Sequence, residues 1–215
     1  MDKTVTFYIV RHGETLLNQL HRAQGWCDSP LTENGINSAI HLGHELSKIY
    51  FKAAFCSDTM RAFSTTELVL SSCGQSNIKI KTDKRLREWC LGNWEAEYNH
   101  KFISDVLTTF PMYHNFNDLN LHLDKVCNFI FKTDTTGLAE TFEIIINRLI
   151  NFFKEIGNSN LINNGSNILV TTHAFVIKTL VYLFSKEMLN SLNKIENATY
   201  LCAVWDGKKI TIKNR

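Results

Sequence analysis

The sequence FYIVRHGETLLN, at residues 7–18, constrains the fold of this chain more than any other stretch. Its apolar part, residues 7–10, predicts a short buried strand, and a helical pattern follows residues 11–15. Arg11, His12 and Gly13 thus stand where a strand gives way to a helix, and open α/β sheets bind ligands at such points. A helix N-terminus also favours an anion. The stretch predicts that His12 meets a phosphate; the alternative is a surface histidine in a tight turn.

Two further segments repeat this layout of strand, basic side chain and helix. A strand at residues 53–56 leads to Arg61 in a helix over about 60–70, and a strand at 167–172 leads to His173 and a helix over 174–184. We also expect helices at 15–21, from Thr32 onward and at 138–153, an edge strand at 78–80, and a hairpin of strands at 200–205 and 209–212. This alternation predicts a three-layer α/β fold, with a mostly parallel central sheet and helices on both faces.

The length of 215 residues suits a single domain spanning 1–215. Residues from about 98 to 137 are rich in Phe, Asn and His and show mixed periodicity. We interpret this segment as a helical insertion that covers the active site.

The charge balance excludes several classes of partner. Lys and Arg number 23 against 21 Asp and Glu, a net charge of +2 that is too balanced to indicate nucleic acid or a membrane surface. No apolar stretch is long enough to span a bilayer, and no signal-peptide pattern begins the chain. The six cysteines contain no C-x-x-C pair. We therefore expect a cytoplasmic protein; its oligomeric state cannot be derived from the sequence.

Parallel strands place their carboxyl ends at one edge of a sheet. Arg11, His12, Arg61 and His173 can therefore converge on one crevice, where they would form a pocket for a doubly charged oxyanion. Taken singly, Arg61 could be a helix surface residue and His173 a satisfied core histidine. Taken together, the arginine and histidine side chains that follow three separate strands favour the pocket.

Such a pocket suggests a mechanism. Neutral imidazole is a good nucleophile, and neighbouring arginines should keep His12 uncharged near pH 7, with a backbone carbonyl fixing its tautomer. The leaving alkoxide needs a proton, for which Glu88 and Glu95 in REWCLGNWE are the candidates. A carboxyl beside Trp89 can have a raised pKa. The alternative is that both glutamates are solvated surface acids.

Four ordered motifs now carry a resemblance. RHGETLLN with QGW and LTENG, then SDTMRAFST, LREWCLGNWE and VTTHAFVI resemble the segments of the histidine phosphatase superfamily, also called the phosphoglycerate mutase-like superfamily. The resemblance spans residues 5 to about 184 and is weak only between 98 and 137. It implies that His12 becomes phosphorylated, that Glu88 donates the proton, and that no metal or cofactor is needed. It further implies a phosphate site formed by Arg11, Asn18, Gln24, Gly25, Arg61 and His173.

The sequence departs from the family pattern at two positions. Ala174 follows the second histidine where glycine is usual, and Ala96 follows Trp94-Glu95 where glycine is expected. Neither is a presumed catalytic side chain. The methyl group of Ala174 would tighten the pocket.

Within the superfamily the choice is between phosphatase and mutase. A bisphosphate-dependent mutase needs extra cations, yet the chain has no arginine between Arg87 and Arg148. The covering segment instead offers aromatic side chains: Phe102, Phe110, Tyr113, Phe116, Phe129 and Phe131. We therefore expect a metal-independent hydrolase of small-molecule phosphomonoesters that acts through phosphohistidine on His12. The alternatives are mutase-type phosphoryl transfer and a non-catalytic phospholigand-binding protein. Cysteine-phosphatase and P-loop motifs are absent, because Cys56 and Arg61 have only four residues between them and no G-x-x-x-x-G-K-[ST] occurs.

Overall fold

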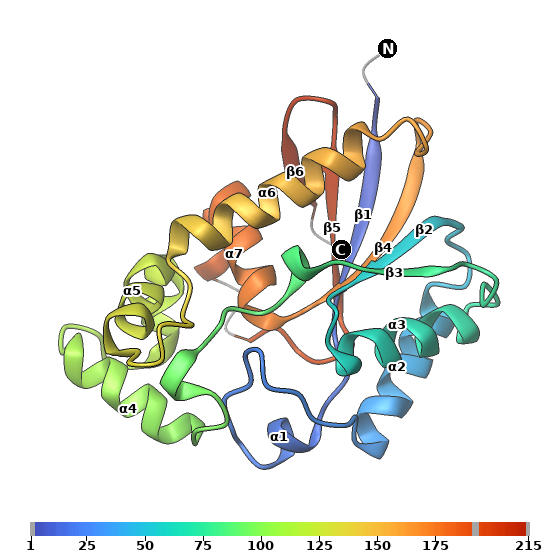
Figure 1. Cartoon of the computed structure of the whole chain (residues 1–215). Coiled ribbons are helices and arrows are strands. Elements are labelled where there is room, and N and C mark those ends of the chain that lie inside the picture. Colours follow the sequence, from blue (N-terminus) through green and yellow to red (C-terminus); the bar gives the residue numbers. More distant parts are fainter. Residues whose placement is uncertain (1–2, 191–193, 214–215) are drawn as a thin grey trace.

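The computed structural model describes residues 3–190 and 194–213 and is built on a six-stranded sheet of order β3-β2-β4-β1-β5-β6 (Figure 1). The strands are β1 (Val5–Arg11), β2 (Phe51–Cys56), β3 (Ile80–Thr82), β4 (Ser166–Thr172), β5 (Tyr200–Trp205) and β6 (Ile210–Lys213). β4 pairs in parallel with β1 and β2, and β2 pairs in parallel with β3. β5 is antiparallel to both β1 and β6. The sheet is thus mostly parallel, as predicted, with an antiparallel hairpin at one edge.

Helices cover both faces of the sheet (Figure 1). Successive side chains of a strand point to opposite faces. On β1, Val5, Phe7 and Ile9 join the hydrophobic cluster that includes α6 (Phe142–Asn158) and α7 (Ala174–Phe184). Val10 instead joins the cluster formed with α2 (Glu33–Glu45) and α3 (Met60–Ser72). This alternation makes the three layers.

The segment between 98 and 137 is helical, as expected. It contains α4 (Asn99–Thr109), the 3-10 helix η3 (Phe116–His122) and α5 (Leu123–Thr133). In Figure 1, α4 and α5 lie at the end of the molecule beyond α6 and α7. Phe102 and Val106 of α4 belong to the same hydrophobic cluster as β1. The remaining helices are α1 (Leu16–Gln19), η1 (Lys84–Leu86), η2 (Gly92–Trp94) and η4 (Lys186–Asn190). Within the described ranges, no helix combines the length and apolar character that a membrane crossing requires.

The predicted helix over 138–153 begins later than expected, at the N-cap Thr141, whose side chain accepts a hydrogen bond from the Ile144 amide. The preceding residues instead form a turn around Asp134, whose carboxylate accepts backbone hydrogen bonds from Thr136, Leu138 and Ala139. Leu138, the first residue of the predicted helix, is 61% exposed. The predicted edge strand is at the edge but lies two residues later, as β3. The first helix is shorter than predicted, because His21 adopts a positive φ of 53°.

Candidate active site

The residues that follow the parallel strands meet beyond their carboxyl ends. Arg11 ends β1 and His12 follows it, Arg61 lies in the first turn of α3, and His173 is the N-cap of α7. The imidazole rings of His12 and His173 are 5.2 Å apart between centroids. Arg61 Nη2 lies 3.1 Å from His173 Nδ1. His12, Arg61 and His173 are at most 3% exposed, so neither Arg61 nor His173 is a surface residue.

The ring of His12 is held in one orientation by its own turn. Nδ1 lies 2.8 Å from the carbonyl oxygen of Gly13. A carbonyl only accepts, so Nδ1 carries the proton and Nε2 keeps a lone pair. Burial, followed by the charges of Arg61 and Arg11, lowers the pKa of His12 well below its ordinary value. His12 is therefore a neutral imidazole near pH 7, as the sequence predicted.

Close packing with α2 fixes the backbone after His12. A Cβ atom on Gly13 would lie 2.6 Å from the carbonyl oxygen of Gly35. The Gly13 amide donates to Thr65 Oγ1 on α3 at 2.9 Å. Glycine is therefore needed here for a close approach of two backbones.

The segment before β5 closes against the same turn and was not anticipated. Asn197 Nδ2 donates to the carbonyl of His12 at 3.0 Å and to Asn18 Oδ1 at 3.3 Å. The amide of Arg11 donates to the carbonyl of Thr199, and the amide of Ala198 donates to the carbonyl of Arg11. Asn197 is separated from His12 by 185 positions, and nothing in its local sequence signals this contact.

Arg61 arranges the site rather than lining its cavity. Its Nη1 donates to the carbonyl of Cys27 and to Asp28 Oδ1, while Nη2 donates to the carbonyl of Gly25 at 2.7 Å. Because arginine only donates, His173 Nδ1 accepts from Nη2 and the proton of His173 sits on Nε2. Among the described residues, His173 Nε2 has no hydrogen-bond partner. Burial lowers the pKa of His173, so this imidazole is a neutral donor.

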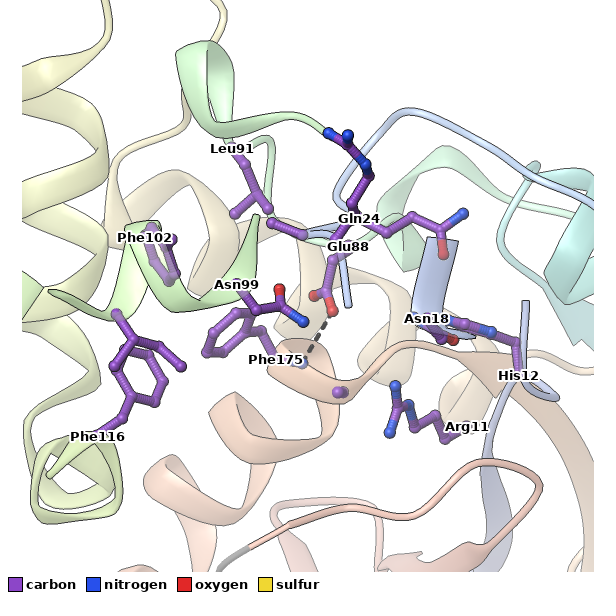
Figure 2. A pocket seen from close by; sticks show the side chains of 14 residues that line it. Arg11, His12, Asn18, Gln24, Glu88, Leu91, Asn99, Phe102, Phe116 and Phe175 are labelled. Atoms are coloured by element: carbon purple, nitrogen blue, oxygen red, sulfur yellow. Dashed lines mark hydrogen bonds between the residues drawn. The ribbon is translucent and has the colours of Figure 1, made fainter. Parts of the chain in front are cut away.

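A cavity opens between His12 and the segment 98–137 (Figure 2). Of the predicted site residues, five line it: Arg11, His12, Asn18, Gln24 and Glu88. Arg61, His173 and Gly25 are not among its lining residues. Gly25 has a packing role, since a Cβ atom there would lie 2.3 Å from Glu95 Oε1.

Asn18 and Gln24 present amide groups to this cavity from either side of Thr15. The carbonyl oxygen of Asn18 accepts from the Thr15 amide at 3.3 Å. The carbonyl oxygen of Gln24 accepts from Thr15 Oγ1 at 2.7 Å, and its Nε2 donates to Ser29. Since both oxygens face protein donors, the amide nitrogen of Asn18 and the second N–H of Gln24 can donate to an anion in the cavity.

Glu88 lies between η1 and η2, and its side chain reaches the start of α7. Its carboxylate accepts hydrogen bonds from the amides of Trp89 and Phe175 at 3.0 Å and of Val176 at 3.2 Å. In Figure 2 it lies between the Arg11–His12 side and the aromatic side of the cavity. Burial raises the pKa of Glu88, although these hydrogen bonds oppose the shift. Glu88 is thus a buried carboxyl within the cavity wall.

Glu95, the other candidate acid, is engaged elsewhere. Its two carboxylate oxygens accept four backbone hydrogen bonds, from Gly25, Trp26, Cys27 and Leu91. It does not line the cavity. Its carboxylate anchors the 25–27 loop, so the geometry favours Glu88 as the acid.

An ion pair between Arg148 on α6 and Glu140, which precedes this helix, positions the backbone of residues 85–88, the acid segment that contains Glu88. Arg148 binds Glu140 through Nε and Nη2 at 2.7 and 2.8 Å. Its remaining donors reach three carbonyls, of Arg85, Arg87 and Glu88. The side chains of Arg148 and Glu140 are only 12% and 10% exposed. The guanidinium of Arg148 therefore fixes the backbone of the acid segment, a contact that the sequence did not predict.

The far end of the cavity is mostly apolar. Phe102 and Phe116 line it, as expected for the aromatic covering segment. Phe129 is instead buried, Phe131 is 46% exposed, and Phe110 and Tyr113 pack against the core. The expectation was wrong for these four side chains. The helix α5 turns Phe129 and Phe131 to different faces, and Phe110 and Tyr113 lie beyond the end of α4. The sequence analysis missed other lining residues: Arg22, Leu91, Asn99, Ile103 and Phe175.

Comparisons with known proteins identify the fold and the family. A phosphoglycerate mutase structure from Bacillus anthracis str. Sterne matches with a TM-score of 0.88 and 33% identity, covering 100% of this chain and 93% of that chain. Phosphoglycerate mutase-like protein 4 of Arabidopsis thaliana is 28% identical over 210 residues, 95% of this chain and 82% of that protein. The alpha-ribazole phosphatase from Shigella flexneri shares the fold, with a TM-score of 0.70, 23% identity and coverage of 97% and 94%. Residues 7–215 match the histidine phosphatase superfamily (branch 1), and the chain belongs to that superfamily.

Proposed function

We propose that this protein hydrolyses phosphomonoesters through a phosphohistidine formed on His12. One observation carries the proposal: a buried neutral imidazole, with its Nδ1 proton held by the Gly13 carbonyl, faces a cavity that also contains Glu88. Arg11 lies in the same cavity wall, and Arg11 Nε has no partner among the described residues. The pocket can therefore balance the charge of a phosphoryl group.

In the first step, His12 Nε2 attacks phosphorus and the bond to the ester oxygen breaks. Glu88 transfers its proton to the departing alkoxide, which leaves as the alcohol. Arg11 and the Nε2 proton of His173 neutralise charge on the phosphoryl oxygens. Arg61 acts through His173 by fixing the tautomer that presents this proton.

In the second step, Glu88 is a carboxylate and accepts a proton from water. The water oxygen attacks phosphorus, the N–P bond breaks, and the electron pair returns to His12 Nε2. Inorganic phosphate leaves, with Glu88 protonated again for the next cycle. Every cationic group and every acid or base that acts on the phosphoryl group in this scheme is a side chain of the protein, so the scheme requires no metal.

Hydrolysis is preferred over transfer because of the wall opposite His12. Phe102, Ile103, Phe116 and Phe175 contribute apolar surface, and the segment 98–137 contributes no arginine. Mutase-type transfer is the second candidate, favoured by the likeness to the Bacillus anthracis phosphoglycerate mutase structure. An assay of 3-phosphoglycerate interconversion, run beside phosphate release, separates the two.

Labelling stopped with an alkaline denaturant, which preserves phosphohistidine, tests the intermediate. Brief incubation with a ³²P-labelled monoester should leave acid-labile label on His12, and the His12→Ala variant should carry none and release no phosphate. His44→Ala, an exposed histidine on α2, is the matched control and should retain both. Undiminished turnover by His12→Ala would exclude the proposal. Tight phosphate binding without turnover by the unaltered protein would instead indicate a non-catalytic binding protein.

A further inference from the structure

A second cavity joins the first on the side of α7. The two share wall residues: Arg11, Ile103, Phe116, Ala174 and Phe175. Figure 2 shows Phe116 and Phe175 on the side of the site away from His12. A molecule bound at His12 can therefore extend past the Phe175 ring into this side cavity.

The side cavity has a cationic wall. Lys178 and Lys194 line it together with Arg11, and none of its described lining residues is acidic. Lys194 is at the exposed rim, where it pairs with Glu196 at 2.8 Å. Lys178 is only 7% exposed and thus forms the inner end. A buried ammonium is costly, so its position in a cavity wall needs a reason.

Lys178 makes a hydrogen bond with a neutral side chain. Its Nζ donates to the neutral amide oxygen of Asn120 at 2.7 Å. Arg11 likewise donates to a neutral group, the carbonyl of Ile195. Burial, followed by the charge of Arg11, lowers the pKa of Lys178 to about 8. An anion in the side cavity would offset this cost.

The position of Lys178 along α7 sets how long a substrate must be to contact both His12 and Lys178. Ala174 and Lys178 are four residues apart and so lie on one face of the helix. The rise of an α-helix separates them by about 6 Å along its axis. Lys178 thus lies one turn deeper than the residue adjacent to His173.

We propose that Lys178 binds a second anionic group on the alcohol part of the substrate, a carboxylate or a second phosphate. The carbon chain between the two groups packs on Phe116 and Phe175. This assignment rests on the proposed hydrolase activity and narrows its substrates to monoesters with an anionic tail.

A homologous ester series tests the assignment. ω-Carboxyalkyl phosphates with two to five methylenes are each compared with the alkyl phosphate and the alkanediol bisphosphate of equal length. The unaltered protein should prefer the anionic-tailed esters, with a maximum at one length. In Lys178→Met this preference should fall about tenfold, the value of one hydrogen bond between charged groups. Lys178→Arg should retain it, and Lys101→Met, an exposed lysine paired with Glu97, should match the unaltered protein.

The readout is a ratio of kcat/KM values on one preparation, so any misfolded fraction cancels. A higher ratio for the carboxylates identifies a carboxylate subsite, and a higher ratio for the bisphosphates identifies a phosphate subsite. No preference in the unaltered protein, or an equal preference in Lys178→Met, overturns the assignment. If no ester releases phosphate, the hydrolase proposal fails separately. Titration calorimetry with the same esters then tests the subsite, with the same ratio of affinities expected.

Discussion

Two imidazoles in this site are given opposite chemistry by their neighbours. The Gly13 carbonyl accepts from Nδ1 of His12 and leaves a lone pair on Nε2. Arg61 donates to Nδ1 of His173 and leaves a proton on Nε2. One imidazole thus presents a lone pair at Nε2, and the other, with its ring centroid 5.2 Å away, presents a proton. Replacing Arg61 would remove the hydrogen bond that fixes the tautomer of His173 and one of the two charges that lower the pKa of His12.

At the same scale, Glu88 should govern the alkaline limb of the pH profile. Its pKa is raised by burial, so the acid is lost as the pH rises through this raised value, and kcat/KM for alkyl phosphates should fall. The pKa of His12 is lowered, so the nucleophile is lost only well below pH 6.5. Glu88→Gln should remove the alkaline limb and lower kcat/KM by about 10²–10⁴-fold.

Steady-state kinetics from pH 4 to 9 measure this effect. The loss should be much smaller for p-nitrophenyl phosphate, because nitrophenolate leaves without a proton. Glu143→Gln, an exposed carboxyl on α6, serves as the control. An alkaline limb that persists in Glu88→Gln would assign the acid to another group.

At the scale of elements, α6 holds the acid segment through Arg148. Arg148→Met removes the guanidinium and leaves Glu140 without its ion-pair partner. The Glu140 side chain is only 10% exposed. We expect the free energy of unfolding to fall by about 3 kcal/mol. Urea denaturation measures this change, with Lys154→Met on the exposed face of α6 as the control.

The kinetics of Arg148→Met should show whether Arg148 also positions Glu88 for proton transfer, apart from its effect on stability. Because the carbonyl of Glu88 loses the Arg148 donor and keeps only Trp26 Nε1, kcat for alkyl phosphates should fall more than kcat for p-nitrophenyl phosphate. Equal losses for both substrates would show that Arg148 supports only the fold.

Sequence reasoning succeeded where chemistry follows a strand directly. Arg11, His12 and His173 each come within a residue of the end of a buried parallel strand, and topology alone brings them together. It failed where a contact joins distant segments. Asn197 meets His12, and Arg148 meets Glu88, without any local pattern that marks the pair. The prediction for the covering segment, residues 98–137, failed for a further reason. Its apolar residues follow no single helical period, so the sequence does not indicate which aromatic side chains face the cavity.

For the whole molecule, the site is a junction between layers. Arg11 and His12 follow the central strand, Arg61 comes from a helix on one face, and His173 begins a helix on the other. Bound anion would therefore connect both helical layers to the sheet. Ligand binding to the native state alone should stabilise the entire fold.

Thermal unfolding with orthovanadate tests this connection. At a concentration 100 times its Kd, a ligand adds about 2.7 kcal/mol, which corresponds to about 5–10 °C for a domain of this size. Calorimetry should show this rise, and Arg11→Met should lose most of it. Potassium chloride at equal ionic strength is the control. A matching shift in chloride would attribute the effect to general screening.

The contact of residues 197–199 with the His12 turn also orders events during synthesis. Arg11 and His12 are translated early, yet three of the hydrogen bonds that hold their backbone come from Asn197, Ala198 and Thr199. The central strand likewise pairs with β4 and β5, which are translated more than 150 residues later. A nascent chain on the ribosome therefore carries His12 long before it can position it. Under the proposed mechanism, phosphoryl chemistry would wait until β5 has left the exit tunnel.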